Sequence, residues 1–186
     1  MPRMTLIATA LSAVLSVPAA QADDITDALS SATKAYEQGD IQYALEELEY
    51  AKQLMMALKT DALVEFLPPP PQDWSRTVNT EMTASLGLMG GGTGAEARYD
   101  NGNNSFTVSL MADNPMVGAM AGLLGNAASI GARIERVGRQ KFMVQDGELT
   151  ALVDSRILVK ATGEDIDTML ATLETMDFRA LGDFGR

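Results

Sequence analysis

The chain has 186 residues and carries 25 acidic against 14 basic side chains, a net charge of −11, with no cysteine and no histidine. This balance argues against a nucleic-acid or anionic-membrane partner, because both require a basic surface that neutralises phosphates. The missing residue types exclude disulfide bonds, zinc or haem sites that need Cys or His, and catalytic pairs of Ser or Cys with His. The length suits one ordinary domain with appendages.

Residues 1–22 have the pattern of an export signal. One basic residue, Arg3, precedes an apolar run (6–17) and a stretch of small residues that ends at Ala22. The pattern predicts cleavage before Asp23 and a protein exported to the periplasm. A retained membrane anchor is the alternative, but about 12 apolar residues are fewer than the roughly 20 that span a bilayer. We therefore expect no stable transmembrane anchor.

Residues 23–67 show the apolar spacing of helices, in two stripes on either side of Gly39 and Asp40. A glycine relaxes the backbone where a helix ends, and an aspartate can accept the first free N–H groups of the next helix. The stretch therefore predicts a helical hairpin. The two helices share the pattern Ala35-Tyr36-x-x-Gly39-Asp40-x-x-x-Ala44-Leu45-x-x-Leu48-x-x-Ala51. It resembles the core of a single tetratricopeptide repeat, in which small alanines let two antiparallel helices approach closely.

One such repeat cannot bury its own apolar face. We therefore expect the hairpin to pack on the rest of the protein or on a partner. The candidate partner-binding residues are aromatic side chains of the hairpin and of the segment after it, namely Tyr36, Tyr43, Tyr50 and Trp74.

Residues 68–73 include four consecutive prolines. Such a run cannot form the interior of a helix or a sheet, and it predicts a short, rigid polyproline linker. A ligand for an aromatic groove on another protein is the alternative. We expect residues 74–186 to form one α+β domain.

The apolar period changes from 3.6 to 2 after the prolines, and residues 74–86 predict a strand with one polar face. A β-hairpin is expected at 95–112, joined by an Asp/Asn-rich turn, and four short strands are expected within 132–162. Short connections of this kind favour antiparallel pairing.

Two helices complete the domain. The first is uncharged from Pro115 to Ala132 and is capped by Asp113 or Asn114. Its 18 residues would reach about 27 Å, so a membrane-inserting helix is the alternative to packing on a sheet or on a second subunit. The closing helix starts at Thr162-x-x-Asp165 and has one apolar face.

The expected fold class is α+β, an N-terminal helical hairpin followed by a largely antiparallel sheet with two packed helices. The order of elements across residues 74–180 is similar to the α/β/α sandwich of PsbP-type proteins. This resemblance implies an adaptor or assembly factor more than an enzyme.

Methionines are the soft metal ligands that this composition leaves, and thioethers can hold Cu(I) without Cys or His. Met111, Met116 and Met120 gather near the start of the uncharged helix, where the i, i+4 spacing puts the last two on one face. Filling of the core is the alternative role.

An acid–base enzyme would depend on carboxylates, but these occur at turns or beside arginines. The candidates are Glu135, Asp146, Glu148 and Asp154. No phosphate loop, nucleophile elbow or dinucleotide fingerprint is present. We therefore expect no enzyme and no cofactor, and a hydrolase built on a carboxylate pair is the weakest of three hypotheses.

The leading hypothesis is a non-catalytic periplasmic interaction or assembly protein, which binds an envelope protein or associates with itself. The hairpin and the apolar central helix would be its contact surfaces. The second hypothesis is a periplasmic carrier of Cu(I) or of a small apolar ligand, held in a Met-rich cleft between the sheet and the central helix.

Overall fold

The computed structural model describes residues 19–88, 90–125 and 131–186. The chain divides into two compact units, Met1–Leu54 and Met55–Arg186, here named the hairpin unit and the sheet unit. Most of the predicted export signal lies outside the described residues. The division falls inside a helix and differs from the predicted ranges 23–67, 68–73 and 74–186.

The hairpin unit consists of α1 (Ala19–Glu37) and the first part of α2 (Ile41–Val64), which confirms the predicted helical hairpin. Gly39 connects the helices with a φ of +81°, a conformation that glycine adopts without steric cost. Asp40 begins α2, because its carboxylate accepts a hydrogen bond of 3.1 Å from the backbone N–H of Tyr43. The turn therefore forms for the local reasons that the sequence indicated.

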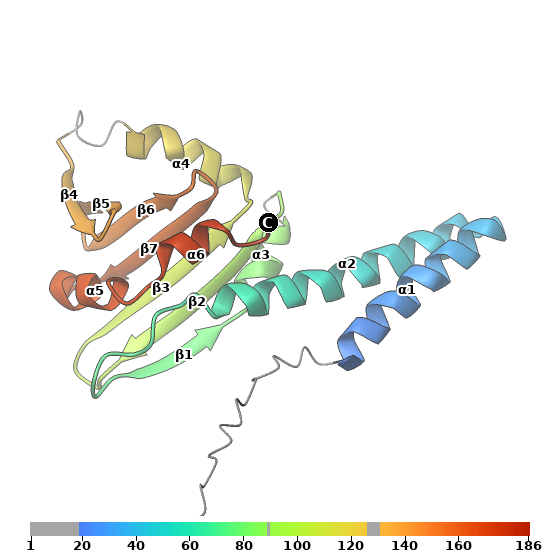
Figure 1. The fold of residues 1–186 in the computed structure, drawn as a ribbon, viewed down its shortest axis with the longest axis horizontal. Helices are drawn as coiled ribbons and strands as arrows, with labels where there is room; N and C mark the ends of the chain where they lie inside the picture. The colour runs from blue at the N-terminus through green and yellow to red at the C-terminus, as the bar shows by residue number, and fades with distance from the viewer. Residues whose placement is uncertain (1–18, 89, 126–130) are drawn as a thin grey trace, which may run out of the picture. The chain divides into compact units, whose positions relative to one another are not determined.

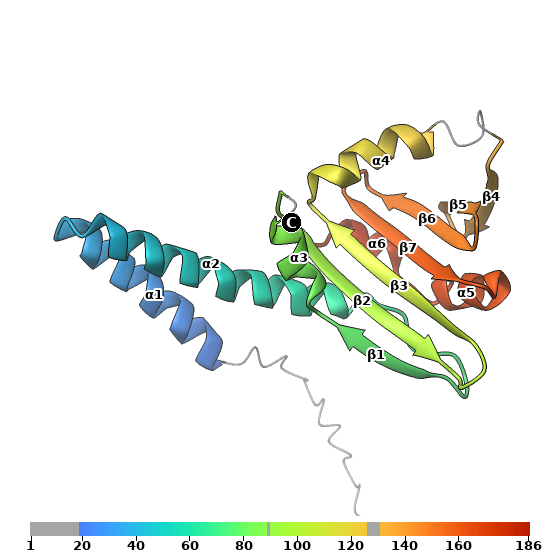
Figure 2. The same cartoon turned by 180° about the vertical axis from the view of Figure 1, so that it is seen from behind.

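The sheet unit contains seven strands among the described residues, in the spatial order β1-β2-β3-β7-β6-β5-β4. Every neighbouring pair is antiparallel, as predicted. Figures 1 and 2 show the sheet from its two sides. The strands are β1 (Ser75–Asn79), β2 (Thr93–Asp100), β3 (Ser105–Ala112), β4 (Arg133–Val137), β5 (Gln140–Gln145), β6 (Glu148–Val153) and β7 (Ile157–Gly163).

The main core lies on one face of this sheet, covered by α5 (Ile166–Leu173), α6 (Phe178–Gly182) and the last turns of α2 (Figure 1). Alternate residues of the strands point into it, and β3 shows strict alternation of buried and half-buried positions. Tyr99 stacks on Phe106 with ring centroids 4.7 Å apart. Asp165 caps α5 by accepting the backbone N–H of Thr168 at 3.0 Å, whereas Thr162 of the predicted helix start belongs to β7.

The opposite face carries α3 (Met82–Leu88), and α4 (Pro115–Gly125) packs against β6 (Figure 2). The predicted strand over 74–86 is therefore wrong in its second half. A Cβ at Gly94 would lie 2.7 Å from Sδ of Met82 and 2.9 Å from Cδ1 of Leu86, so the glycine in β2 lets these two side chains pack closely on the strand. The hydroxyl of Thr83 also bonds both the N–H and the C=O of Gly94, at 2.9 Å each.

The helix α4 begins where the sequence indicated, and Asn114 is its cap. The side-chain oxygen of Asn114 accepts the backbone N–H of Met116 at 2.8 Å. The helix ends at Gly125 in the structure, while residues 126–130 of the predicted helix lie outside the described residues.

The start of the predicted proline linker packs on the sheet unit. Pro68 is buried, and its carbonyl oxygen accepts hydrogen bonds from the hydroxyl of Tyr99 at 2.6 Å and from Nη1 of Arg76 at 3.2 Å. Leu67, directly before it, belongs to the core. The contact with Tyr99 joins residues 31 positions apart in the chain, whereas Arg76 lies only eight residues after Pro68.

Candidate functional site

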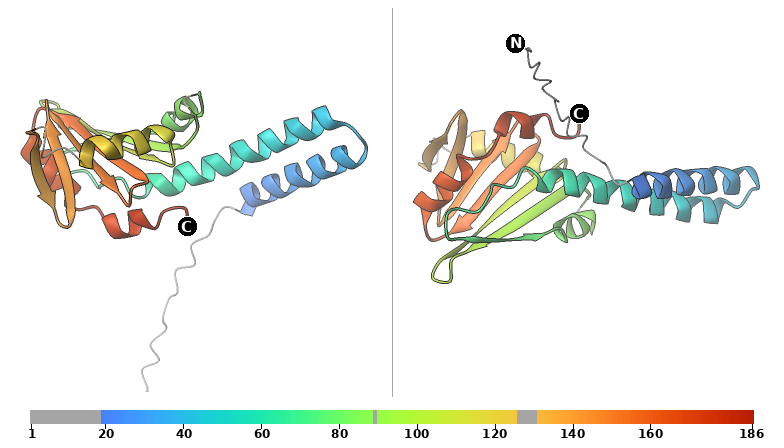
Figure 3. Two further views of the ribbon diagram at one scale, coloured as in Figure 1. Left: turned by 90° about the horizontal axis from the view of Figure 1, so that it is seen from above. Right: turned by 60° about the horizontal axis from the view of Figure 1, so that its bottom comes forward.

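The interior of the helical hairpin is built from alanine alone. The buried apolar residues of the hairpin unit, among those described, are Ala28, Ala32, Ala35, Ala44 and Ala51. Alanine has the smallest side chain that still packs, so the two helices come close together. Figure 3 shows the antiparallel pair from two further directions. Most of the larger apolar side chains of the hairpin unit are exposed instead.

Exposed large apolar side chains gather on this unit. Among the described residues, seven of the ten such side chains belong to it, with 40–69% of their surface exposed: Leu29, Tyr36, Ile41, Tyr43, Leu45, Leu48 and Tyr50. Isolated exposed leucines are ordinary on protein surfaces, whereas a contiguous apolar patch indicates an interaction site.

Four of these side chains line one groove between the helices. This apolar groove has a volume of about 380 Å³, and its lining consists of Ala32, Thr33, Tyr36, Ile41, Ala44, Leu45 and Leu48. Ile41, Leu45 and Leu48 lie on one side of α2 because successive residues turn by about 100° around a helix. The groove therefore runs along about two turns of α2.

A second groove lies on the opposite side of the helix pair and is acidic. This acidic groove has a volume of about 280 Å³ and is lined by Asp24, Asp27, Ala28, Ser31, Tyr43, Glu47 and Tyr50. The hydroxyl of Ser31 donates a hydrogen bond of 3.4 Å to the hydroxyl oxygen of Tyr43 across the two helices. The two grooves differ in chemistry, one apolar and one carboxylate-lined.

The four predicted partner-binding aromatics have different surroundings. Tyr36 lines the apolar groove, and Tyr43 and Tyr50 line the acidic groove. Trp74 belongs to the sheet unit, where its half-buried ring packs on Phe106 with centroids 5.1 Å apart. The three tyrosines are open surface residues, and Trp74 borders the core.

The three predicted copper ligands lie around the junction of β3 and α4. Met111 is half-buried on the face of β3 opposite the core. Met116 is 44% exposed at the first turn of α4, and Met120 follows one turn later, half-buried. Within the described ranges, no group of three or more Asp or Glu side chains could hold a metal ion. The methionine site stays a prediction.

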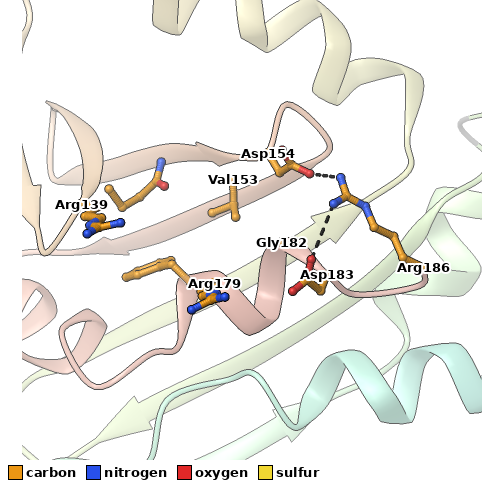
Figure 4. A pocket seen from close by; sticks show the side chains of 9 residues that line it. Arg139, Val153, Asp154, Arg179, Gly182, Asp183 and Arg186 are labelled. Carbon is orange, nitrogen blue, oxygen red and sulfur yellow. Dashed lines mark hydrogen bonds and ion pairs between the residues drawn. The ribbon is translucent and has the colours of Figure 1, made fainter.

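A cavity of the sheet unit, about 480 Å³ in volume, is lined by three arginines (Figure 4). Arg186 pairs with Asp154 and, at 3.6 Å, with Asp183, which fixes its guanidinium at one end. Arg139 and Arg179 have no carboxylate within 4.0 Å in the part of the chain that the structure describes. The cavity therefore combines two free guanidinium groups with one that is neutralised.

Asp154, one of the predicted acid–base residues, lines this cavity together with a second carboxylate, Asp183. Asp183 was not among the carboxylates predicted from the sequence. Both carboxylates face the same guanidinium, and their side chains are 46% and 71% exposed. Both carboxylates are thus paired with Arg186 at the surface, where they remain open to water.

A second charge cluster ties distant parts of the sheet unit together around Asp113. Its carboxylate accepts from Nζ of Lys59 at 2.9 Å and from Nη2 and Nε of Arg156 at 2.9 and 3.0 Å. Arg156 also donates to the carbonyl oxygen of Phe184 at 3.2 Å. Partial burial acts to raise the pKa of Asp113, but the hydrogen bonds and charges of the two cations outweigh it and lower the pKa below its usual range.

The comparisons with known proteins give no relative. No family model matches the chain, and neither a curated protein nor a solved structure matches it. Among the described residues, no helix has the length and apolar character needed to cross a membrane. The resemblances to a tetratricopeptide repeat and to PsbP-type proteins therefore stay expectations.

Proposed function

We propose that this chain is a non-catalytic protein of the periplasm that acts in interaction or assembly, by binding another protein through its helical hairpin. The observation that carries the proposal is the inverted packing of the hairpin unit, with alanines inside and leucine, isoleucine and tyrosine outside. The export-signal pattern of residues 1–22 supports the location.

The energetic reason is the apolar surface that remains in water. Burying a large aliphatic side chain completely contributes about 1.5–3 kcal/mol, and Ile41, Leu45 and Leu48 are each about half exposed. Covering these three would contribute on the order of 3 kcal/mol before the tyrosines are counted. A protein partner that fills the groove can recover this free energy.

The test is capture of a partner from the envelope with a purified, tagged chain after mild crosslinking. The double variant Leu45→Ser/Leu48→Ser removes the apolar lining but leaves the alanine interior and the Gly39 turn intact. Circular dichroism checks that its helices form. We expect the variant to lose the partner that the natural chain retains.

The matched control is Ile134→Ser, because Ile134 is a 37% exposed apolar side chain on β4 of the sheet unit. This variant should retain the partner. Equal capture by the groove variant, or a natural chain that elutes alone as a monomer, would refute the proposal.

A further inference from the structure

The apolar groove has the geometry of a docking site for one helix. A helix packs when its side-chain ridges enter the groove between the ridges of its neighbours, and two close antiparallel helices leave such a groove on each side. Here one groove is apolar along about two turns of α2. A partner helix with anchors at positions i, i+3 or i+4, and i+7 would match that length.

The rim of this groove is acidic. Each of three groove residues is followed directly by an exposed glutamate: Tyr36 by Glu37, Leu45 by Glu46 and Leu48 by Glu49. One residue further along a helix is a rotation of about 100°, so these carboxylates lie beside the apolar stripe on its outer side.

The whole hairpin has the same sign of charge. Residues 23–54 carry eight carboxylates and two lysines, a net charge of −6. Lys52 is paired with Glu49 at 3.1 Å, which leaves Lys34 as the other cation of this segment. Because the opposite, acidic groove is also lined by carboxylates, the negative potential surrounds the helix pair.

This charge decides between the possible occupants. A second copy placed groove to groove would set two glutamate rims against each other, and like charges in such positions are unfavourable. Lysines or arginines beside the anchors of a partner helix would instead meet Glu37, Glu46 and Glu49.

We propose that the occupant of the apolar groove is an amphipathic helix of another protein with basic residues flanking its apolar face. This inference rests on the proposed function. This helix packs as a third helix against α1 and α2. Its apolar anchors cover Ile41, Leu45 and Leu48, and its cations pair with the glutamate rim.

The test measures binding of fluorescent 18-residue peptides to the full chain by anisotropy. The first peptide has leucines at i, i+3, i+4 and i+7 spacing with flanking lysines. The second has glutamates in place of the lysines, and the third has the composition of the first in scrambled order. We expect the first peptide to bind at least tenfold more tightly than either of the others.

Two variants assign the binding to the groove and to its rim. Leu45→Ser/Leu48→Ser should weaken binding of the first peptide at least tenfold. Glu46→Gln/Glu49→Gln should weaken it several-fold and reduce its dependence on salt, while Ile134→Ser should leave it unchanged. Equal binding of the scrambled peptide would mean unspecific charge attraction and would overturn the inference.

The source of positive charge needs a separate measurement. Arg136, Arg139, Lys141 and Arg179 of the sheet unit have no ion-pair partner among the described residues, so a second copy could supply basic groups. Sedimentation of the natural chain should show a monomer, and self-association abolished by Leu45→Ser/Leu48→Ser would overturn the inference. If envelope capture depends on the groove but the lysine peptide binds no better than the glutamate peptide, the proposed function stands and this inference fails.

Discussion

The Asp113 cluster allows a prediction about stability in which sign and size both follow from the geometry. Asp113→Asn removes the charge that faces Lys59 and Arg156. Asparagine is the suitable substitute because Asp113 has a φ of +56°, a left-handed conformation that asparagine tolerates and alanine does not. The variant therefore tests the charge without adding backbone strain.

The expected loss is about 1–2 kcal/mol in the free energy of unfolding at pH 7. A hydrogen bond to a charged group contributes roughly 1.5–3 kcal/mol when buried, and the carboxylate accepts three. The three side chains are about a third exposed, so solvent screening reduces this contribution. The estimate is accordingly well below the sum of three buried bonds.

The pH dependence has a definite direction. The pKa of Asp113 is lower in the folded protein than in the unfolded chain, so its stabilisation is fully present above the unfolded value near 4. It is lost as the pH falls through the folded value. The difference between natural chain and variant should therefore be constant from about pH 6 to 9 and should shrink below about pH 4.

Urea unfolding followed by tryptophan fluorescence measures this difference, because the single tryptophan, Trp74, lies in the sheet unit beside Phe106. The control is Asp100→Asn, which discharges the exposed pair with Arg98, where the atoms are 3.3 Å apart. We expect a loss below about 0.5 kcal/mol there. An Asp113→Asn effect no larger than the control, or one that persists unchanged at pH 3, would refute the reasoning.

Two further predictions concern a buried phenol and the methionines. Burial raises the pKa of Tyr99 to about 12, although Arg76 opposes the shift, so absorbance titration should show one tyrosine ionising far above pH 10. Tyr99→Phe should remove this high-pH ionisation and lower the free energy of unfolding by about 0.5–1.5 kcal/mol below pH 10. The natural chain should lose stability as the pH rises from 10 to 12, and the variant should not show that loss. If Met116 and Met120 bind Cu(I), Met116→Leu/Met120→Leu should abolish stoichiometric copper retention in an anaerobic titration with metal analysis; equal retention by both chains excludes this site.

The sequence predicted those turns and helix ends that a few adjacent residues determine. The Gly39 and Asp40 turn, the Asp/Asn-rich turn between β2 and β3, and the Asn114 cap of α4 each depend on a few adjacent residues. The antiparallel sheet followed from the short connections between strands.

Long-range contacts explain the elements that the sequence did not predict. Residues 82–86 alternate like a strand, yet they form a helix that packs its Met82 and Leu86 side chains over Gly94 of β2. The sequence predicts a rigid proline linker but not its anchoring, in which the hydroxyl of Tyr99, 31 residues away, donates to the carbonyl oxygen of Pro68. Both the contact of α3 with Gly94 and that of Tyr99 with Pro68 join residues that are separated by a turn or more of other structure.

The candidate site was predicted only in part, for a related reason. Tyr36, Tyr43 and Tyr50 were expected as contact residues, and all three are exposed. Leu45 and Leu48 belonged to an apolar stripe that would ordinarily face the interior. Apolar spacing does not distinguish the face that packs from the face that stays open, and here the alanines occupy the interior.

The alanine interior links the fold of the hairpin to its proposed role. Close packing of small side chains removes little apolar surface from water, so the hairpin gains less from its own core than the sheet unit does from aromatic and branched residues. A partner that binds only the folded hairpin stabilises it by mass action. The placement of small apolar side chains inside and large ones outside thus lowers the intrinsic stability of the hairpin. It also raises the free energy that is available when a partner binds. Exchanging Leu45 and Leu48 for polar residues should therefore weaken partner binding, because about half of the surface of each side chain is open in the groove and available to a partner.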